Sequence, residues 1–277
     1  MGKWPSLDKL ELKKGSIGDK EYVRELRKLQ HQLLDLQIHH HQTGGRVVIG
    51  IDGWDAAGKG GLIQRMIYGL EPRSTHVWRI GAPTESEQGR HYLWRFWERL
   101  PARRNWAVFD RTWYGRVLVE RIEGFCTKDE WKRAYREINE FERQLADDGV
   151  CIVKLLTHVS AEEQKRRMIE RLEDPHKRHK LGIEDFRNIA KRKLYLEAYD
   201  DMLEKTDTDH APWHVIATDD KKTARLEGLK HLVDTIGKGV KITENELDPR
   251  IAEAAAKLWG WKPGGKNAKN GKGDQEK

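Results

Sequence analysis

Cysteine is scarce in this sequence, and long apolar runs are missing. The 277 residues include only two cysteines, Cys126 and Cys151. These are too few for a disulfide framework, and no Cys/His spacing resembles a zinc site. No run of about 18 apolar residues exists, so no membrane span is expected. The opening residues MGKWPSLDKL lack the apolar core of a secretory signal. Together these features predict a reducing, cytoplasmic setting.

An excess of acidic charge is also missing. Lys and Arg total 52 against 45 Asp and Glu, which gives a net charge of +7, and charged residues make up 35% of the chain. This balance favours a polyanionic partner, and nucleic acid, a lipid surface or a phosphate polymer would each fit. The sequence has no RNA- or DNA-reading motif. We therefore expect no nucleic acid and no membrane among the partners.

Alternating strands and helices predict an α/β fold. Apolar, β-branched runs predict five strands, and segments with helical spacing lie between them. This order is typical of a parallel sheet with helices on both faces. The expected strands are 47–52, 76–80, 106–110, 150–157 and 213–218. The expected helices are 19–41, the stretch from the glycine loop to 70, 83–100, 129–147, a helix after 160, 183–205 and a helix from 221.

The chain length suits one large domain and is short for two. We predict a helical arm over 1–45, and a core over 46–240 with a lid at about 160–185. The remaining segment, 241–277, is expected to form a helix followed by a disordered basic tail. The tail KPGGKNAKNGKGDQEK offers nothing to bury.

The stretch GWDAAGKGG, Gly53 to Gly61, resembles a phosphate-binding loop with two departures. The common loop reads G-x-x-x-x-G-K-[ST], and its hydroxyl holds magnesium. Here Gly60 replaces the hydroxyl, and an acid, Asp55, lies inside the loop. A strand before and a helix after would let backbone N–H groups converge on phosphate, with Lys59 as a point charge. The alternative is a glycine-rich turn with a surface lysine. The predicted phosphate-binding residues of the loop are Gly53, Ala56, Ala57, Gly58, Gly60 and Gly61.

Two acids are candidates for holding a metal ion. A bare carboxylate at Asp55 would repel phosphate unless a magnesium ion lies between them. Asp110 ends a predicted strand, the usual place for a second metal-holding acid in such folds. The alternatives are that Asp55 caps the following helix and that Asp110 forms a turn. Two acids without a loop hydroxyl favour metal binding by Asp55 and Asp110.

Basic side chains follow the third predicted strand. Arginine forks bind phosphoryl oxygens and offset charge that develops during phosphoryl transfer. On spacing alone, a charged helix face with internal ion pairs explains the pattern equally well. The arginines are Arg111, Arg116 and Arg121, and the acids beside them are Glu120 and Glu123.

A second basic segment spans 160–180. Ser160 and Glu163 have the spacing of a capping box, which predicts a helix start. Arg167 and Arg171 lie four residues apart and so share one helix face. Such a segment after a strand fits a mobile lid that closes over phosphates. The alternative is a solvated basic helix.

These motifs occur together in one known family. The chain resembles polyphosphate kinase family 2 over roughly residues 19–240, through GWDAAGKGG, PTESEQGRHYLWRFWERLP, FDRTWYGRVLVERIEGF, SAEEQKRRMIERLEDPHKRHK and AYDDMLEKTDTDHAPWHVIATDDKKTAR. The resemblance implies a P-loop kinase-like three-layer α/β/α sandwich with a parallel sheet and a helical lid. It also implies reversible phosphoryl transfer between inorganic polyphosphate and a purine nucleotide, with Mg²⁺ or alternatively Mn²⁺, in a dimer or tetramer. The catalytic roles that it implies fall on Asp55, Lys59, Asp110, Arg111 and Arg171.

Further site residues are weaker candidates. The predicted nucleotide- or phosphate-binding set outside the loop is Arg116, Glu120, Arg121, Arg167 and His179. The predicted polyphosphate channel contains Arg65, Arg73, Lys177 and Lys180. Family members often have an aromatic residue where this chain has His179, and a lysine where it has Gln64. Base stacking and one polyphosphate contact are therefore open questions.

The phosphate acceptor is predicted from one motif. WYGRVLVER resembles members that phosphorylate nucleoside monophosphates, whereas many diphosphate-using members have WYNRAGVER. Monophosphate enzymes often contain two fused copies of the domain, and this chain has one. We expect AMP to ADP, with ADP or GDP to the triphosphate, or dual use, as the alternative. The competing hypotheses are an ATP-dependent small-molecule kinase, which the missing loop hydroxyl disfavours, and a non-enzymatic nucleic-acid-binding module.

Overall fold

A parallel five-stranded sheet forms the centre of the computed structural model, which describes residues 4–12, 15, 17–242 and 247–262. The strand order is β2-β3-β1-β4-β5. The predicted α/β class and all five predicted strands are confirmed, with ends that differ by at most one residue. The strands are β1 (Arg46–Gly53), β2 (Thr75–Arg79), β3 (Trp106–Asp110), β4 (Val150–His158) and β5 (Trp213–Ala217).

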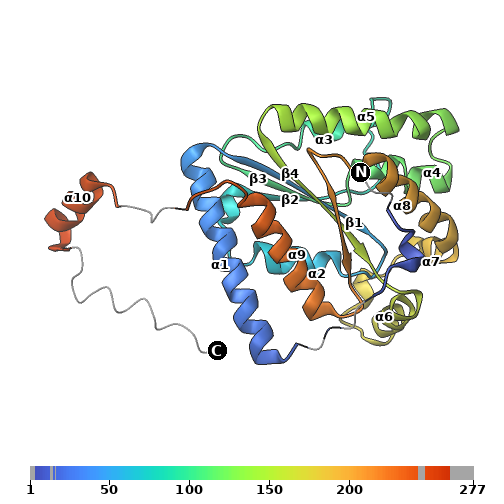
Figure 1. Ribbon diagram of the computed structural model, residues 1–277, viewed down its shortest axis with the longest axis horizontal. Helices are drawn as coiled ribbons and strands as arrows, with labels where there is room; N and C mark the ends of the chain where they lie inside the picture. The colour runs from blue at the N-terminus through green and yellow to red at the C-terminus, as the bar shows by residue number, and fades with distance from the viewer. Residues whose placement is uncertain (1–3, 13–14, 16, 243–246, 263–277) are drawn as a thin grey trace. The chain divides into compact units, whose positions relative to one another are not determined.

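Helices cover both faces of this sheet (Figure 1). Strand β1 shows why, because Val47, Ile49 and Ile51 pack into one apolar core and Val48 packs into the other. A strand buried on both faces needs a helical layer on each. One layer contains α1 (Asp19–Thr43), α2 (Lys59–Ile67) and α9 (Lys221–Ile236). The other contains α3 (Trp94–Trp97), α4 (Val119–Glu123), α5 (Lys128–Asp147) and α8 (Arg192–Thr206).

Two more helices follow the C-terminal end of β4. They are α6 (Ala161–Glu173) and α7 (Ile183–Ala190), with the short 3-10 helix η4 (Arg178–Lys180) between them. The sequence predicted one helix over 183–205, but the structure has two, α7 and α8. Lys191, with φ −100° and ψ 19°, separates them. Its ammonium pairs with Glu123 of α4 at 2.8 Å.

The predicted helix over 83–100 is mostly wrong. Only α3 is α-helical there, and the residues before it form turns, with Gly89 at φ 74°. The Glu87 carboxylate accepts a hydrogen bond from the Thr84 N–H at 3.0 Å and pairs with Arg99 at 2.6 Å. Glu87 is only 8% exposed. The segment therefore folds around a buried acid, a tertiary contact that overrides local helical propensity.

The N-terminal residues pack against α8. The 3-10 helix η1 (Leu7–Lys9) buries Leu7 completely, and the Leu7 N–H donates to Asp200 at 2.9 Å. The Trp4 indole N–H donates to Asp207 at 2.8 Å. Two other 3-10 helices are η2 (Pro72–Ser74) and η3 (Trp113–Arg116).

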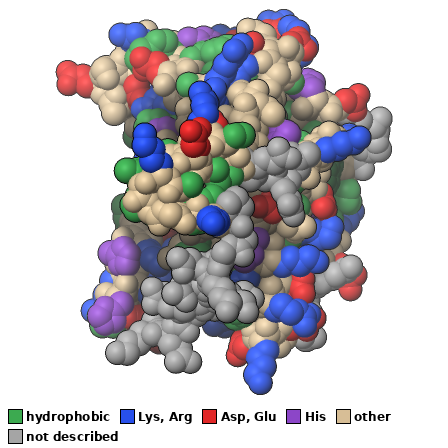
Figure 2. Space-filling model, turned by 90° about the vertical axis from the view of Figure 1, so that its left-hand side faces the viewer, with side chains coloured by type: hydrophobic (Ala, Val, Ile, Leu, Met, Phe, Trp, Pro, Cys, Tyr) green, Lys and Arg blue, Asp and Glu red, His purple; other side chains and the backbone are tan. Residues whose placement is uncertain are grey.

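The chain divides into two compact units, Met1–Val240 and Lys241–Lys277. All five strands belong to the first unit. The second contains α10 (Pro249–Trp259), whose N-terminus is capped by the side chain of Asp248. The tail predicted to be disordered lies outside the described residues from 263 onward. Among the described helices, none is both long and apolar enough to cross a membrane. On the face shown in Figure 2, basic side chains lie among acidic ones.

Candidate active site

The glycine loop joins β1 to α2, so the predicted strand–loop–helix arrangement is confirmed. Gly53 has φ 135°, and a Cβ there would lie 2.2 Å from the Thr157 carbonyl oxygen, so only glycine fits. Gly58 (φ 101°) and Ala56 (φ 61°) also have left-handed backbone. A non-glycine residue in that region carries a conformational cost and often marks a functional loop. The tight loop directs the start of α2 toward the C-terminal edge of the sheet.

Side chains hold four consecutive carbonyl groups of this loop. The Lys59 ammonium donates to the Gly53 oxygen at 2.7 Å and to the Trp54 oxygen at 2.9 Å. The Gln164 amide donates to the Asp55 oxygen at 2.9 Å, and the Arg167 guanidinium donates to the Ala56 oxygen at 3.0 Å. Since the carbonyl oxygens are occupied by these donors, the loop is held in a shape that a phosphate-binding loop requires.

Lys59 lies among three carboxylates. It is 9% exposed, and burial lowers the pKa of its ammonium. Asp55, Asp110 and Asp52 oppose that shift by their negative charge. All three acids therefore act on one buried cation. Asp110 reaches this point because it is the last residue of β3 and pairs in register with Ile51 of β1.

Both carboxylate oxygens of Asp55 have protein donors. Arg111 donates to Oδ1 at 3.2 Å, and the Asn188 amide donates to Oδ2 at 2.8 Å. Burial pushes the pKa of Asp55 upward, but Lys59, Asn188 and Arg111 outweigh burial, so the pKa is below its ordinary value. The N-cap position of α2 is Gly58, without a side-chain hydrogen bond. The alternative that Asp55 caps this helix is therefore wrong.

Asp52 is a buried acid that the sequence analysis did not single out. It is 4% exposed and accepts a hydrogen bond from the Thr112 hydroxyl at 2.6 Å. Burial raises its pKa to about 6, against the opposing effects of Thr112 and Lys59. The feature of the sequence that could have identified Asp52 is its position in the apolar strand sequence VVIGID. A polar residue in such a run is informative because burying a carboxylate is costly.

Asp55 and Asp110 are the two acids that the sequence predicts as cation ligands. Among the residues that the structure describes, no group of three or more His, Cys, Asp or Glu side chains is arranged to bind a metal. Asp55 and Asp110 nevertheless both act on Arg111 as well as on Lys59. Mg²⁺ in phosphoryl-transfer sites is usually held by one or two carboxylates together with substrate phosphates and water. These two acids supply that number of protein ligands.

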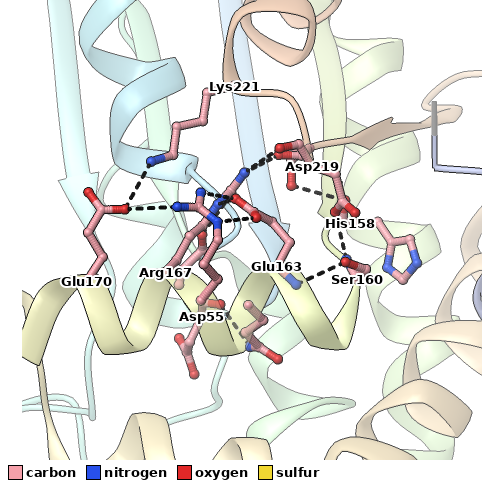
Figure 3. Close-up of polar contacts among 12 residues, drawn as sticks. Asp55, His158, Ser160, Glu163, Arg167, Glu170, Asp219 and Lys221 are labelled. Carbon is pink, nitrogen blue, oxygen red and sulfur yellow. Dashed lines mark hydrogen bonds and ion pairs between the residues drawn. The ribbon is translucent and has the colours of Figure 1, made fainter. Parts of the chain in front are cut away.

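Arg167 of α6 points toward Glu163 and Asp219 (Figure 3). It is 3% exposed, and four of its five N–H groups are used by Glu163, Ala56 and the carbonyls of Thr218 and Asp219. The predicted role in binding nucleotide or phosphate therefore conflicts with its contacts. We assign it instead to shaping the loop, through its bond to the Ala56 carbonyl.

Arg171, one turn further along α6, is half-buried and donates to the Lys180 carbonyl at 3.4 Å. Burial raises the pKa of Asp185, Asp55 adds to that rise, and Arg171 and Arg111 oppose it. Arg171 therefore lies within electrostatic reach of the same site as Asp55. Its predicted catalytic role stays a prediction.

The arginines after β3 differ in their surroundings. Arg111 contacts Asp55, as described above, and has φ 67°. Arg116 pairs with Glu120 at 3.0 Å and lies 4.4 Å from the centre of the Tyr92 ring. Arg121 pairs with Asp201 of α8 at 2.7 Å. The interpretation by internal ion pairs thus accounts for Arg116 but not for Arg121, whose partner lies on another helix. Phosphate binding by Arg116, Glu120 and Arg121 stays a prediction.

The predicted channel residues have partners outside the loop. Arg65 donates to Gln64 at 2.6 Å, Arg73 pairs with Glu71 at 2.8 Å, and Lys177 pairs with Glu170 at 2.6 Å. Lys180 is an exposed residue of η4, as is His179, whose predicted part in nucleotide or phosphate binding stays a prediction. None of these residues lines the cavity beside Asp55. A polyphosphate channel through them stays a prediction.

A cavity of about 80 Å³ opens beside Asp55 and Arg111. One side is aromatic, because the Trp54 ring contacts that of Tyr199, with ring centres 4.9 Å apart. The sequence analysis missed most of the lining residues, because they come from separate segments of the chain that only the fold brings together. The lining residues that were missed are Asp52, Trp54, Gly115, Leu118, Val119, Gln164, Glu184, Arg187, Asn188, Tyr195 and Tyr199.

A family model described as polyphosphate kinase 2 matches residues 16–244. The chain belongs to the polyphosphate kinase 2 family. The predicted family membership is confirmed. The fold is also similar to that of a solved polyphosphate kinase 2 from Arthrobacter aurescens TC1, in agreement with the P-loop kinase-like architecture that the resemblance implied. That structure has a TM-score of 0.84 and 31% identity, over 92% of this chain and 94% of that one.

Two curated relatives of this polyphosphate kinase 2 chain carry different names. A polyphosphate:AMP phosphotransferase of Pseudomonas aeruginosa is 45% identical over 231 residues, 83% of this chain. An ADP-polyphosphate phosphotransferase of the same organism is 40% identical over 219 residues, 79% of this chain and 72% of that protein. The chain spans 46% of the length of the AMP-named relative.

Proposed function

We propose that this chain transfers a phosphoryl group reversibly between inorganic polyphosphate and a purine nucleotide, with AMP to ADP as the favoured reaction. The observation that carries the proposal is the arrangement at the glycine loop: Lys59 binds the loop carbonyls and Arg111 pairs with Asp55 at 3.2 Å. Asp110 ends the neighbouring strand, in register with Ile51. Family membership and the names of the relatives support it.

Phosphoryl transfer requires that the phosphate charges are neutralised and that the two reacting groups are aligned. A terminal nucleotide phosphate is already ionised, so no strong general base is needed to activate it. Lys59 uses two of its three N–H groups on loop carbonyls and keeps one for a phosphate oxygen. Arg111 is 47% exposed and presents its remaining donors to an incoming phosphate. Both cations would offset charge in the transition state.

Asp55 and Asp110 would hold the cation, Mg²⁺ or alternatively Mn²⁺. When bound, such an ion neutralises phosphate oxygens and aligns the two reacting groups. The low pKa of Asp55 keeps its carboxylate ionised and therefore able to bind a cation. With Gly60 in place of the usual hydroxyl, the protein's share of the ligands falls on these acids.

Fewer observations support the proposal that AMP is the phosphate acceptor. Gly115, from the WYGRVLVER motif, lines the cavity beside Asp55. The AMP-named relative has the higher identity of the two described above. The ADP-named relative supports the alternative, ADP or GDP to the triphosphate. We also propose a homo-oligomer, dimer or tetramer, on family grounds alone. An ATP-dependent small-molecule kinase is the remote alternative.

A substrate matrix tests the proposal. AMP, ADP, GMP and GDP are each incubated with polyphosphate and Mg²⁺, and the products are separated by chromatography. We expect ADP from AMP as the fastest product. Faster formation of ATP or GTP would replace AMP by the diphosphate alternative. Absence of transfer to all four nucleotides would reject polyphosphate-dependent transfer, and turnover of ATP with a sugar or nucleoside would support the remote alternative.

A further inference from the structure

Asn188 of α7 makes a contact that the proposed reaction does not use. Its amide N–H donates to Asp55 Oδ2 at 2.8 Å, on the carboxylate oxygen that Arg111 leaves free. With Arg111 on Oδ1, both oxygens of this acid are engaged by protein groups. A cation that binds Asp55 through the lone pair of Oδ2 that the Asn188 amide occupies has to displace this amide. Helix α7 and the cation then compete for one lone pair of Asp55.

The orientation of the Asn188 amide is fixed from its other side. The Tyr195 hydroxyl donates to Asn188 Oδ1 at 3.0 Å. Tyr195 belongs to α8 and is 6% exposed, so its ring is held firmly. An amide whose oxygen accepts from Tyr195 must present its NH₂ group to Asp55. The three side chains form a chain of hydrogen bonds from a fixed helix to the loop.

Helix α7 itself is held mainly by polar contacts. None of its residues is buried, whereas Ile183 is 83% exposed and Phe186 is 42% exposed. Its other attachment is the ion pair of Arg187 with Glu123 at 3.1 Å. Elements with few buried apolar contacts open at low free-energy cost. Loss of the Asn188 contact is therefore able to release the helix.

We propose that Asn188 is a positioning residue that couples α7 to the cation site: it holds Asp55 Oδ2 while the cation is absent and must leave when the cation binds. The inference rests on the proposed role of Asp55 as a cation ligand. It predicts that removal of the amide strengthens cation binding in the absence of substrate, since nothing then has to be displaced.

The experiment measures Mn²⁺ binding by electron paramagnetic resonance, without nucleotide or polyphosphate. The variants are Asn188→Ala, and Asn188→Leu, which keeps the volume of the side chain but has no donor. Tyr195→Phe removes only the hydroxyl that orients the amide. Asp55→Asn measures how much Mn²⁺ binds at sites other than Asp55. Asn139→Ala is the matched control, because it removes an amide that donates to the Lys205 carbonyl at 2.9 Å. Thermal unfolding confirms that each variant is folded.

We expect both Asn188 variants to bind Mn²⁺ about threefold to tenfold more tightly than wild type, the range expected when a hydrogen bond of typical net strength no longer has to be broken. Tyr195→Phe should shift binding in the same direction by less, and Asn139→Ala should not shift it. Unchanged or weaker binding in the Asn188 variants, or no Asp55-dependent binding in any variant, would overturn the proposal. Because no phosphoryl transfer is measured, failure of the proposed function in the substrate matrix is a separate result.

Discussion

At the scale of single residues, the site combines one buried cation with three acids. Lys59 is held against its own loop; burial lowers the pKa of its ammonium, and Asp55, Asp110 and Asp52 oppose that shift. The sequence predicted Lys59, Asp55 and Asp110 because the loop and the strand end mark them. Asp52 was missed because its place in a strand does not reveal its hydrogen-bond partner. That partner, Thr112, follows β3 and is brought to Asp52 only by the fold.

Lys59→Ala should reduce phosphoryl transfer by a factor of about 10² to 10³, the usual cost of removing one preorganised group that stabilises transition-state charge. The measurement is kcat with polyphosphate and the best nucleotide of the matrix. The control is Lys230→Ala, whose lysine pairs with Asp234 on the exposed side of α9. A loss confined to KM, with kcat unchanged, would contradict a role for Lys59 in the transition state.

Arg167→Ala should destabilise the fold by about 3 kcal/mol, because it removes a buried guanidinium that pairs with Glu163 and takes away the donor that three backbone carbonyls share. Urea unfolding followed by circular dichroism measures the change. Arg166→Ala is a close control, since Arg166 pairs with the same Glu163 but is 60% exposed, and should cost under about 1 kcal/mol. Equal losses in the two variants would contradict a structural role specific to Arg167.

At the scale of elements, the lid predicted at about 160–185 contains α6 and only the first residues of α7, and these two helices are held differently. Helix α6 is anchored, with Gln164, Arg167 and Met168 buried, whereas α7 has no buried residue. Helical spacing placed Arg167 and Arg171 on one face but could not tell which of them faces the loop. That depends on how α6 packs against β5 and the loop, which involves residues far apart in the chain. The non-helical segment around Glu87 escaped prediction for the same reason.

Hydrogen exchange should distinguish α6 from α7. Amides of α6 are expected to exchange about tenfold or more slowly than those of α7, since opening α6 exposes buried side chains and opening α7 breaks mainly polar contacts. Exchange measured by mass spectrometry on peptides from each helix gives the comparison. Peptides from α5, which has a complete capping box and a buried face, serve as the slow reference. Equal rates in α6 and α7 would mean that the two helices open together.

At the scale of the whole molecule, the first unit contains the sheet, both apolar cores and every residue of the candidate site. The alternation of apolar strands with helical segments predicted this architecture well, because buried parallel strands have continuous apolar sequences. Segment 241–277 contains eight basic and six acidic residues, so most of the net charge of +7 belongs to the first unit. Attraction of a polyanion is therefore chiefly a property of that unit.

A chain that ends at Val240 should consequently keep both its stability and its activity. None of the described residues from 241 to 262 is buried, so the midpoint of thermal unfolding should change by less than about 2 °C, which is under about 1 kcal/mol for a domain of this size. The KM for polyphosphate should rise by less than about twofold, because most of the positive charge remains. Thermal unfolding and initial rates at fixed ionic strength measure both quantities. A large rise in the KM for polyphosphate with unchanged stability would instead place part of the polyphosphate-binding surface in the second unit. Loss of a contact with substrate raises KM without changing the stability of the fold.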